Sequence, residues 1–452
     1  MRPDPEALAW MMRASEADKA EFVAAMSKQE RNAWRWVWRV WARDSQLPPE
    51  ESWRTWLILA GRGFGKTRAG AEWVRAVAER DPAARIALVA ANLGEARAIM
   101  VEGESGLRRI GTPGQRPAFE SSLRRLTWSN GAQAMLYSAA EPEALRGPQH
   151  SHAWCDEIAK WDHSGDRAVA AWDNLLMGLR LGNDPRIVAT TTPRDVPLVR
   201  RLLAEEGSAD EEGDKGIVIT RGSTFENETN LPARFVRAMR RTFGQSLLGR
   251  QELDGELVLD RPGALWTRAL LEECREPSAS SPATRTVIGV DPSASVGGDA
   301  CGIVVCALGE DGLARVLADA TVEKASPERW ARAVAQAAES WSADRVVAEA
   351  NQGGAMVASV LRAADIALPL KLVHASTGKT ARAEPVAALY EAGRVRHAGL
   401  FARLEDELCG LVAGGGYQGP GRSPDRADAL VWALTELCLS RRTAPRVWVH
   451  GA

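Results

Sequence analysis

The chain has 452 residues, of which 45% are hydrophobic and 26% are charged, values typical of a globular protein with two or three domains. Its net charge of −2 excludes a chain that is basic throughout, so a nucleic-acid surface has to be a local patch. No apolar run reaches membrane-spanning length and no signal peptide is evident, so we expect no membrane partner and a cytoplasmic location. The six cysteines lack C-x-x-C spacing and are expected to be reduced core thiols.

The N-terminal residues 5–42 predict helices, because Ala, Met, Glu and Lys alternate with apolar positions. Four tryptophans crowd the end of this segment, and we expect them to pack onto the domain rather than to stack on bases: Trp34, Trp36, Trp38 and Trp41. A Pro-rich loop then precedes the first strand.

From there strands and helices alternate along the chain. Apolar, β-type runs predict strands at 56–60, 85–91, 133–138, 152–156 and 186–192. Helical patterns cover 67–80, 94–110, 165–181 and 195–206. This alternation predicts an α/β domain with a mostly parallel sheet covered by helices.

The turn after the first strand has the pattern of a P-loop that binds ATP and Mg²⁺. Its glycines let backbone N–H groups surround phosphate oxygens, the lysine reaches the β- and γ-phosphates, and the threonine hydroxyl ligates Mg²⁺. The pattern departs in one place, since Ala60 stands where the first glycine is expected. The candidate residues are Gly61, Arg62, Gly63, Gly65, Lys66 and Thr67.

Two carboxylates, Asp156 and Glu157, end the strand predicted at 152–156. In a P-loop ATPase an acid at this place holds Mg²⁺ and the next one polarises the attacking water, which we predict for Asp156 and Glu157. A further strand ends at Thr190, Thr191 and Thr192, whose hydroxyls either sense the γ-phosphate or cap a turn. Arg146 and Arg62 are the candidates for an arginine finger, and each also fits a plain surface charge.

After a Pro- and Ser-rich stretch from 277, a second series of elements begins. Strands are predicted at 286–291, 301–308 and 314–319, followed by a helix at 327–341 and a strand at 345–349. This order predicts a ribonuclease-H-like α/β nuclease domain.

A second set of acids lies at element ends in this half: Asp291, Glu349, Asp425 and Asp428, with Asp299 as a possible auxiliary acid. Carboxylates at such ends can converge on two divalent ions, Mg²⁺ or Mn²⁺, for phosphodiester cleavage. Each one alone also fits a cap, and the choice between Asp425 and Asp428 stays open. Residues 376–382, which include Lys379 and Arg382, suit a DNA backbone and the start of a helix.

These motifs together resemble the large terminase subunit of tailed bacteriophages, in the variety found in prophages and gene transfer agents. The resemblance extends from about Trp34 to Leu439 and is most specific at residues 53–73 and 425–434. It implies an ATP-driven motor that moves double-stranded DNA into a capsid and an endonuclease that cuts concatemers. It also implies partnership with a portal protein and a small terminase subunit, and a pentamer-like homo-oligomer at the portal.

The resemblance also implies roles for individual residues. Lys66 and Thr67 would bind nucleotide and Mg²⁺, with Asp156 as the acidic Mg²⁺ residue, Glu157 as the catalytic carboxylate and Thr190–Thr192 as the coupling motif. Arg146 would act in trans, and Gln46 would contact adenine. Asp291, Glu349 and Asp428 would hold the nuclease metals, with Asp425 as an alternate or fourth acid.

We predict five segments: a helical segment (1–50), the ATPase domain (51–222), a subdomain and linker (223–283), the nuclease domain (284–440) and a tail (441–452). Two alternative functions remain: a P-loop helicase or translocase with a non-catalytic accessory domain, and a non-catalytic component that binds capsid or portal. The intact second acid set argues against the first, and the presence of both acid sets against the second.

Overall fold

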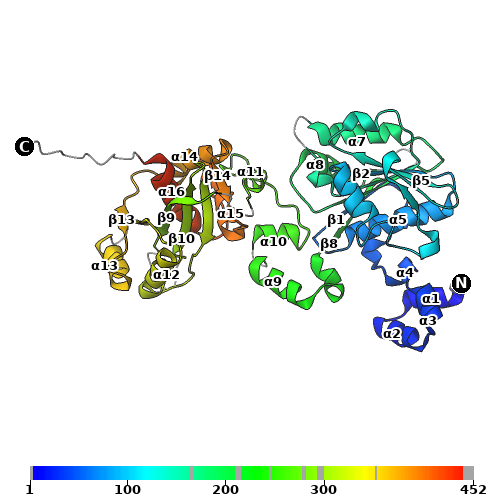
Figure 1. Ribbon diagram of the computed structural model, residues 1–452, viewed down its shortest axis with the longest axis horizontal. Coiled ribbons are helices and arrows are strands. Elements are labelled where there is room, and N and C mark those ends of the chain that lie inside the picture. The colour runs from blue at the N-terminus through cyan, green and yellow to red at the C-terminus, as the bar shows by residue number, and fades with distance from the viewer. Residues whose placement is uncertain are drawn as a thin grey trace, which may run out of the picture. The chain divides into compact units, whose positions relative to one another are not determined.

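A computed structural model describes residues 4–162, 166–208, 215–243, 246–276, 281–292, 300–351 and 354–440. The chain divides into two units, Met1–Leu259 and Asp260–Ala452 (Figure 1). Asp299 and the predicted tail lie outside the described residues. The finer division into five segments stays a prediction.

The first unit contains an eight-stranded sheet in the order β3-β4-β5-β2-β6-β7-β1-β8. Strands β5, β2, β6, β7, β1 and β8 are parallel, and β3 and β4 form an antiparallel extension. The strands are β1 (Trp53–Ala60), β2 (Arg85–Ala90), β3 (Ala118–Glu120), β4 (Arg125–Thr127), β5 (Gln133–Ser138), β6 (His152–Cys155), β7 (Arg186–Thr191) and β8 (Lys215–Gly222).

Helices and helical turns connect these strands. The N-terminal ones are α1 (Pro5–Arg13), α2 (Glu16–Ala25), α3 (Lys28–Trp34), α4 (Trp38–Trp41) and η1 (Asp44–Gln46). Those between the strands are α5 (Lys66–Arg80), α6 (Leu93–Glu95), η2 (Ala96–Val101), η3 (Pro113–Gln115), η4 (Ser121–Leu123), η5 (Pro142–Leu145), η6 (Ile158–Lys160), α7 (Arg167–Gly178) and α8 (Pro197–Ala204). After β8 follow η8 (Thr224–Asn230), α9 (Ala233–Phe243) and α10 (Leu247–Glu252).

The predicted mostly parallel sheet is confirmed, but the short antiparallel strands β3 and β4 were not predicted, and two further elements differ from expectation. The helix predicted at 94–110 ends at Val101, where a wide π-helical turn gives way to tight turns that contain Gly103 and Gly106. Strand β8 was not predicted, because its apolar run is short and follows an acidic, loop-like stretch.

Alternation along the central strand explains why helices cover both faces of this sheet. Trp56 and Ile58 of β1 share one core with Trp73 of α5, whereas Leu57 and Leu59 share the other with residues of α7 and α8. Because side chains of a strand point to opposite faces in turn, one fully apolar strand serves both cores.

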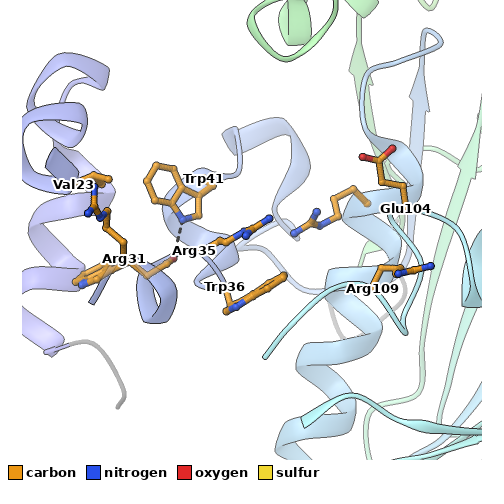
Figure 2. Close-up of a pocket in the computed structure, with 9 residues that line it drawn as sticks. Val23, Arg31, Arg35, Trp36, Trp41, Glu104 and Arg109 are labelled. Carbon is orange, nitrogen blue, oxygen red and sulfur yellow. Dashed lines mark hydrogen bonds between the residues drawn. The ribbon is translucent and has the colours of Figure 1, made fainter. Parts of the chain in front are cut away.

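The N-terminal helices meet the rest of the first unit at a basic and aromatic pocket of about 510 Å³ (Figure 2). In the figure, Arg31 and Trp41 lie on one side, and Glu104 and Arg109 on the other. The lining residues are Val23, Arg31, Trp34, Arg35, Trp36, Trp41, Arg68, Glu104 and Arg109. Four arginines face one glutamate, so positive charge gathers here although the chain as a whole is slightly acidic.

The expectation that the tryptophan cluster packs onto the domain holds for Trp36 and Trp38, which contact the rest of the first unit, but not for Trp34. Trp34 is buried in a small core of the N-terminal helices, and Trp38 packs against the core of the sheet. The Trp36 ring has the guanidinium of Arg35 and that of Arg116 within 5.1 and 5.3 Å of its centroid. Trp41 remains 42% exposed.

The second unit contains a six-stranded sheet in the order β13-β12-β9-β10-β11-β14. Strands β9, β10 and β11 are antiparallel, whereas β12 runs parallel to β9. The strands are β9 (Ala283–Asp291), β10 (Gly302–Gly309), β11 (Ala314–Asp319), β12 (Arg345–Glu349), β13 (Leu370–Val373), β14 (Val395–His397), β15 (Leu411–Val412) and β16 (Gly416–Tyr417). The helices are α11 (Arg268–Glu273), α12 (Pro327–Ser340), α13 (Gly354–Ala364), α14 (Lys379–Glu391), α15 (Ala402–Leu408), α16 (Asp425–Leu434) and η9 (Thr435–Leu439).

The predicted order of three antiparallel strands, a helix and a fourth strand is confirmed. One face of the sheet packs against α14, α15 and α16, and the other against α12 and α13. No helix among the described residues has the length and apolar character needed to cross a membrane.

Two glycines allow α16 to lie directly on this sheet. A Cβ on Gly289 of β9 would lie 1.8 Å from the carbonyl oxygen of Ala429, and one on Gly302 of β10 would lie 1.9 Å from that of Asp425. The absence of side chains at these two positions therefore determines how near the start of α16 comes to the end of β9.

We predict that Gly289→Ala lowers the free energy of unfolding of the second unit by about 2 kcal/mol, because the added methyl group overlaps the backbone of α16. Urea unfolding of the full chain measures the effect. Gly378→Ala is the matched control, since nothing lies within 4 Å of its added Cβ and its φ is −61°. Equal stability of the two variants would contradict this packing argument.

Candidate nucleotide and metal centres

Three parallel neighbouring strands bring the predicted ATPase residues together. Strand β1 pairs with β7, and β7 pairs with β6. Since parallel strands end at the same edge of a sheet, the loop after β1, the acids after β6 and the threonines at the end of β7 meet there. The contacts below all lie at this edge.

Lys66 is the centre of these contacts and is 6% exposed. Its Nζ donates to the carbonyl oxygens of Ala60 (2.8 Å) and Gly61 (3.2 Å) and to Thr192 Oγ1 (3.0 Å). Glu157 Oε1 lies 3.5 Å away. Burial lowers the pKa of Lys66, and the charges of Glu157 and Asp156 oppose this effect. The ammonium group thus joins the phosphate loop to the strand ends opposite.

Asp156 and Glu157 differ in environment although they are adjacent. Asp156 is 3% exposed and accepts a 2.7 Å hydrogen bond from Thr190 Oγ1. Burial, together with the neighbouring charge of Glu157, raises the pKa of Asp156 to about 7. A buried carboxylate that is held beside a second acid suits a cation, which would relieve both effects.

Glu157 is held in place by its backbone and by the end of β7. Its φ of 48° lies in the left-handed region, which is uncommon for a residue other than glycine. Its Oε2 accepts a hydrogen bond from the backbone N–H of Thr192 (3.1 Å), and Thr191 Oγ1 accepts one from the N–H of Ala159 (3.1 Å). Thr191 and Thr192 therefore connect the acidic turn to Lys66.

Side chains that the sequence did not reveal hold the phosphate loop from outside. Arg43 donates to the carbonyl oxygen of Phe64 (2.5 Å), and Asn227 donates to that of Gly63 (2.7 Å). Gln46, predicted to contact adenine, is buried and donates to the carbonyl oxygen of Phe64 at 3.3 Å. These partners engage carbonyl oxygens of the loop, not its N–H groups. The N–H groups of Gly61, Arg62 and Phe64 donate to carbonyl oxygens of the chain itself, so an anion would have to be bound by the remaining N–H groups of the loop. The only sequence signal for the contact of Arg43 with the loop is its position three residues before Gln46.

The segment 252–255 also packs directly on the loop. A Cβ on Gly61 would lie 2.3 Å from the carbonyl oxygen of Leu253, and the N–H of Arg62 donates to the carbonyl oxygen of Glu252 (2.7 Å). The strict need for glycine thus falls on Gly61 rather than on the preceding residue. Ala60 is buried as the last residue of β1 and contributes its carbonyl oxygen to Lys66.

The two arginine-finger candidates lie in different surroundings. Arg62 forms an ion pair with Glu252 at 2.5 Å. The side chain of Arg146 is 74% exposed on the loop after η5, where Glu143 lies 3.6 Å away. The side chain of Arg62 is 65% exposed, so both candidates are accessible to another molecule, and they differ mainly in how close their acidic partner lies. Thr67, in the first turn of α5, is partly buried.

In the second unit the predicted acids lie at one end of the sheet. Strand β12 pairs with β9 so that Ala348 faces Val290, which places Glu349 beside Asp291. Asp425 and Asp428 are in the first turn of α16 and are both buried. Burial raises the pKa of Asp291 well above its ordinary value, and the charges of Asp428, Glu349 and Asp425 add to the increase. The four acids therefore share one electrostatic environment.

Two cations from α14 lie among these acids. Arg382 donates through Nη1 to Glu349 Oε2 (3.1 Å) and through Nη2 to Asp428 Oδ1 (3.0 Å). Lys379 Nζ lies 2.5 Å from Asp428 Oδ2. Burial raises the pKa of Asp428, although both cations oppose the increase. The sequence placed these cations near a DNA backbone but gave no sign of their contact with the acids.

The chemistry of this donor set suits a divalent cation, because carboxylate oxygens are the preferred ligands of Mg²⁺ and Mn²⁺. As the side chains stand, no three acidic, histidine or cysteine residues in the described ranges are arranged to enclose a metal ion. Arg382 bridges two of the acids instead.

Comparisons with known proteins agree with both halves of the chain. Residues 57–273 match the family model "Terminase large subunit, T4likevirus-type, N-terminal", and residues 288–437 match "Terminase RNaseH-like domain". None of the curated proteins matches the chain in sequence.

Several solved structures are similar to the chain. The large terminase of the thermophilic bacteriophage D6E in complex with ADP is 12% identical, with 90% of this chain and 99% of that chain covered and a TM-score of 0.38. The large terminase of bacteriophage HK97 is 16% identical, with 85% and 91% covered and a TM-score of 0.37. The large terminase nuclease of the thermophilic phage G20c with bound cobalt is 18% identical, with 39% and 98% covered and a TM-score of 0.31. The two family matches account for most of the chain, which belongs to the large terminase subunits, DNA-packaging proteins that combine an ATPase domain with an RNaseH-like nuclease domain.

Proposed function

We propose that this chain hydrolyses ATP to move double-stranded DNA into a viral-type capsid and cuts concatemeric DNA with a metal-dependent endonuclease. The observation that carries the proposal is the presence of two separate acidic centres on one chain. One is built around Lys66 and Glu157, with 3.5 Å between Lys66 Nζ and Glu157 Oε1. The other comprises Asp291, Glu349, Asp425 and Asp428.

In the first centre, the loop from Gly61 to Gly65 would bind the phosphates, and Lys66 would exchange its present oxygen partners for phosphate oxygens. Thr67 and Asp156 would hold Mg²⁺, which supplies charge neutralisation to the transferring phosphoryl group. Glu157 would orient and deprotonate the attacking water, because Thr192 fixes the position of its carboxylate. Thr190–Thr192 would report the loss of the γ-phosphate to the acidic turn through the same hydrogen bonds.

In the second centre, Asp291, Glu349 and Asp428 would hold Mg²⁺ or Mn²⁺, with Asp425 as a fourth acid. Divalent ions there would stabilise charge on the phosphodiester oxygens. The bridge from Glu349 through Arg382 to Asp428 supports Asp428 as the third ligand, because it places this acid beside the strand ends.

The portal protein, the small terminase subunit and a pentamer-like ring at the prohead in the host cytoplasm complete the proposal. In such a ring an exposed arginine, Arg146 or Arg62, would stabilise charge on the phosphoryl group bound by a neighbouring copy. A packaging assay with proheads tests the whole proposal. Nuclease-resistant DNA inside the capsid is expected, and ATP-dependent DNA unwinding without packaging would favour the helicase alternative.

We predict that Glu157→Gln lowers the kcat of ATP hydrolysis at least about 100-fold, because the water loses its general base. A coupled phosphate-release assay measures turnover, and plasmid cutting by the same preparation serves as the control. Plasmid cutting is expected to stay intact. Loss of both activities in a folded variant would contradict two independent centres.

A second prediction concerns the nuclease acids. Asp291→Asn should abolish nicking and linearisation of plasmid DNA in Mn²⁺ or Mg²⁺ and leave ATP turnover unchanged, since it removes a charged ligand from the second centre only. Agarose gel electrophoresis measures the cutting. Asp365→Asn is the control, because this carboxylate caps a turn by accepting from the N–H of Ala367. Full cutting by Asp291→Asn would disprove the assignment.

The trans-acting role of Arg146 can be tested by mixing subunits. Arg146→Ala alone is expected to lose ATP turnover by about 10³-fold, because charge on the transferring phosphoryl group is no longer stabilised. Addition of Lys66→Ala subunits, which retain Arg146 but lack the phosphate-binding lysine, should restore part of the turnover. Full turnover by Arg146→Ala on its own would exclude this residue, and Arg62→Ala in the same assay tests the other candidate.

A further inference from the structure

The cations of α14 lie between the acids that would bind metal in the second unit. Each oxygen of Asp428 faces one of them: Oδ1 accepts from Arg382 Nη2 at 3.0 Å, and Oδ2 lies 2.5 Å from Lys379 Nζ. The side chain of Asp428 is 3% exposed and that of Arg382 is 10% exposed. The pair between Arg382 and Asp428 is therefore largely shielded from water, where the loss of a partner is costly, whereas the side chain of Lys379 is 42% exposed.

Arg382 is held in place between two carboxylates, but one of its hydrogen-bond donors has no partner among the described residues. Its guanidinium stacks on Trp432, 4.7 Å from the ring centroid, and the Trp432 indole donates to Glu349 Oε2 at 2.8 Å. Each Nη atom binds a different carboxylate, so neither contact is the stronger two-pronged pair that arginine can form. The Nε of Arg382 is buried without a hydrogen-bond partner among the described residues.

We propose that Arg382 and Lys379 are resident counter-ions of the nuclease acids, and that a divalent metal ion binds by displacing them. The inference rests on the proposed nuclease function of the same acids. Without metal, the two cations compensate carboxylates that would otherwise repel one another in a buried place. This explains why no three acids in the described part of the chain are arranged to enclose an ion as they stand.

The displacement of these two cations has a defined consequence for the affinity of the acids for a metal ion. A metal ion has to break three ion pairs, from Arg382 to Glu349 and to Asp428 and from Lys379 to Asp428, before these oxygens are available. The ion pairs therefore weaken metal binding and stabilise the metal-free fold at the same time. Removal of one cation should change these two properties in opposite directions, which an ordinary structural ion pair would not do.

The test uses the full chain with Mn²⁺ as the probe. Isothermal titration calorimetry of Arg382→Gln should give a Kd for Mn²⁺ about tenfold lower than that of the parent chain. In EDTA the variant should unfold at a lower temperature than the parent, and Mn²⁺ should raise its Tm by more. Arg285→Gln is the matched control, because Arg285 forms a partly buried ion pair with Glu436 from the start of β9, whereas Asp291 ends that strand.

An optical signal gives a second measurement. Because Arg382 stacks on Trp432, its displacement should change tryptophan emission on addition of Mn²⁺, and this change should disappear in Trp432→Phe. An Arg382→Gln variant with unchanged or weaker Mn²⁺ affinity would overturn the counter-ion proposal. So would a loss of stability of equal size with and without Mn²⁺.

The variant Asp291→Asn distinguishes failure of the counter-ion proposal from failure of the proposed nuclease function. Both proposals require that Asp291→Asn remove a Mn²⁺ site and plasmid cutting together. If Mn²⁺ binding and cutting survive in Asp291→Asn, the proposed nuclease centre is wrong and the counter-ion proposal falls with it. If Asp291→Asn loses both while Arg382→Gln binds Mn²⁺ no more tightly, only the counter-ion proposal is refuted.

Discussion

Both acidic centres depend on a buried cation that lies among carboxylates. In the first unit Lys66 links the phosphate loop to Glu157 and Thr192, and in the second Arg382 links Glu349 to Asp428. Acids that are brought together at the ends of strands repel one another, and burial strengthens the repulsion. A basic side chain supplied by a helix that follows a strand reduces this cost, although the pKa values of Asp156, Asp291 and Asp428 remain raised. The two folds, otherwise unrelated, solve the same electrostatic problem.

The candidate site residues that stand in a recognisable local sequence pattern could be predicted. A strand, glycines, Lys66 and Thr67 occur together within a few residues, and the alternation of strands and helices indicates where Asp156, Asp291 and Glu349 end their strands. The adjacency of β6, β7 and β1 was not predicted, because a parallel sheet does not by itself fix the order of its strands. In addition, the helix predicted at 94–110 was wrong beyond Val101, because the glycines there favour tight turns over a continued helix.

The side chains that hold the candidate site residues in place could not be predicted, because their contacts join distant parts of the chain. Asn227 reaches Gly63, and Arg382 reaches both Glu349 and Asp428, without any periodic or spacing signal. Residues 223–283 were predicted only as a subdomain and linker, yet they contain the backbone that packs on Gly61. Such contacts depend on tertiary packing, which a single sequence does not display.

The close contact between Gly61 and Leu253 lies just before the point where the chain leaves the first unit. Gly255 follows two residues later with a φ of 72°, and a Cβ there would lie 2.5 Å from the carbonyl oxygen of Gly222 and 3.0 Å from the nitrogen of Gly61. The backbone leaves the first unit at Leu259, only four residues beyond. The chain therefore passes from the backbone that packs on the candidate phosphate loop into the second unit within a few residues, and a substitution at Gly255 would disturb the loop and the start of this connection together.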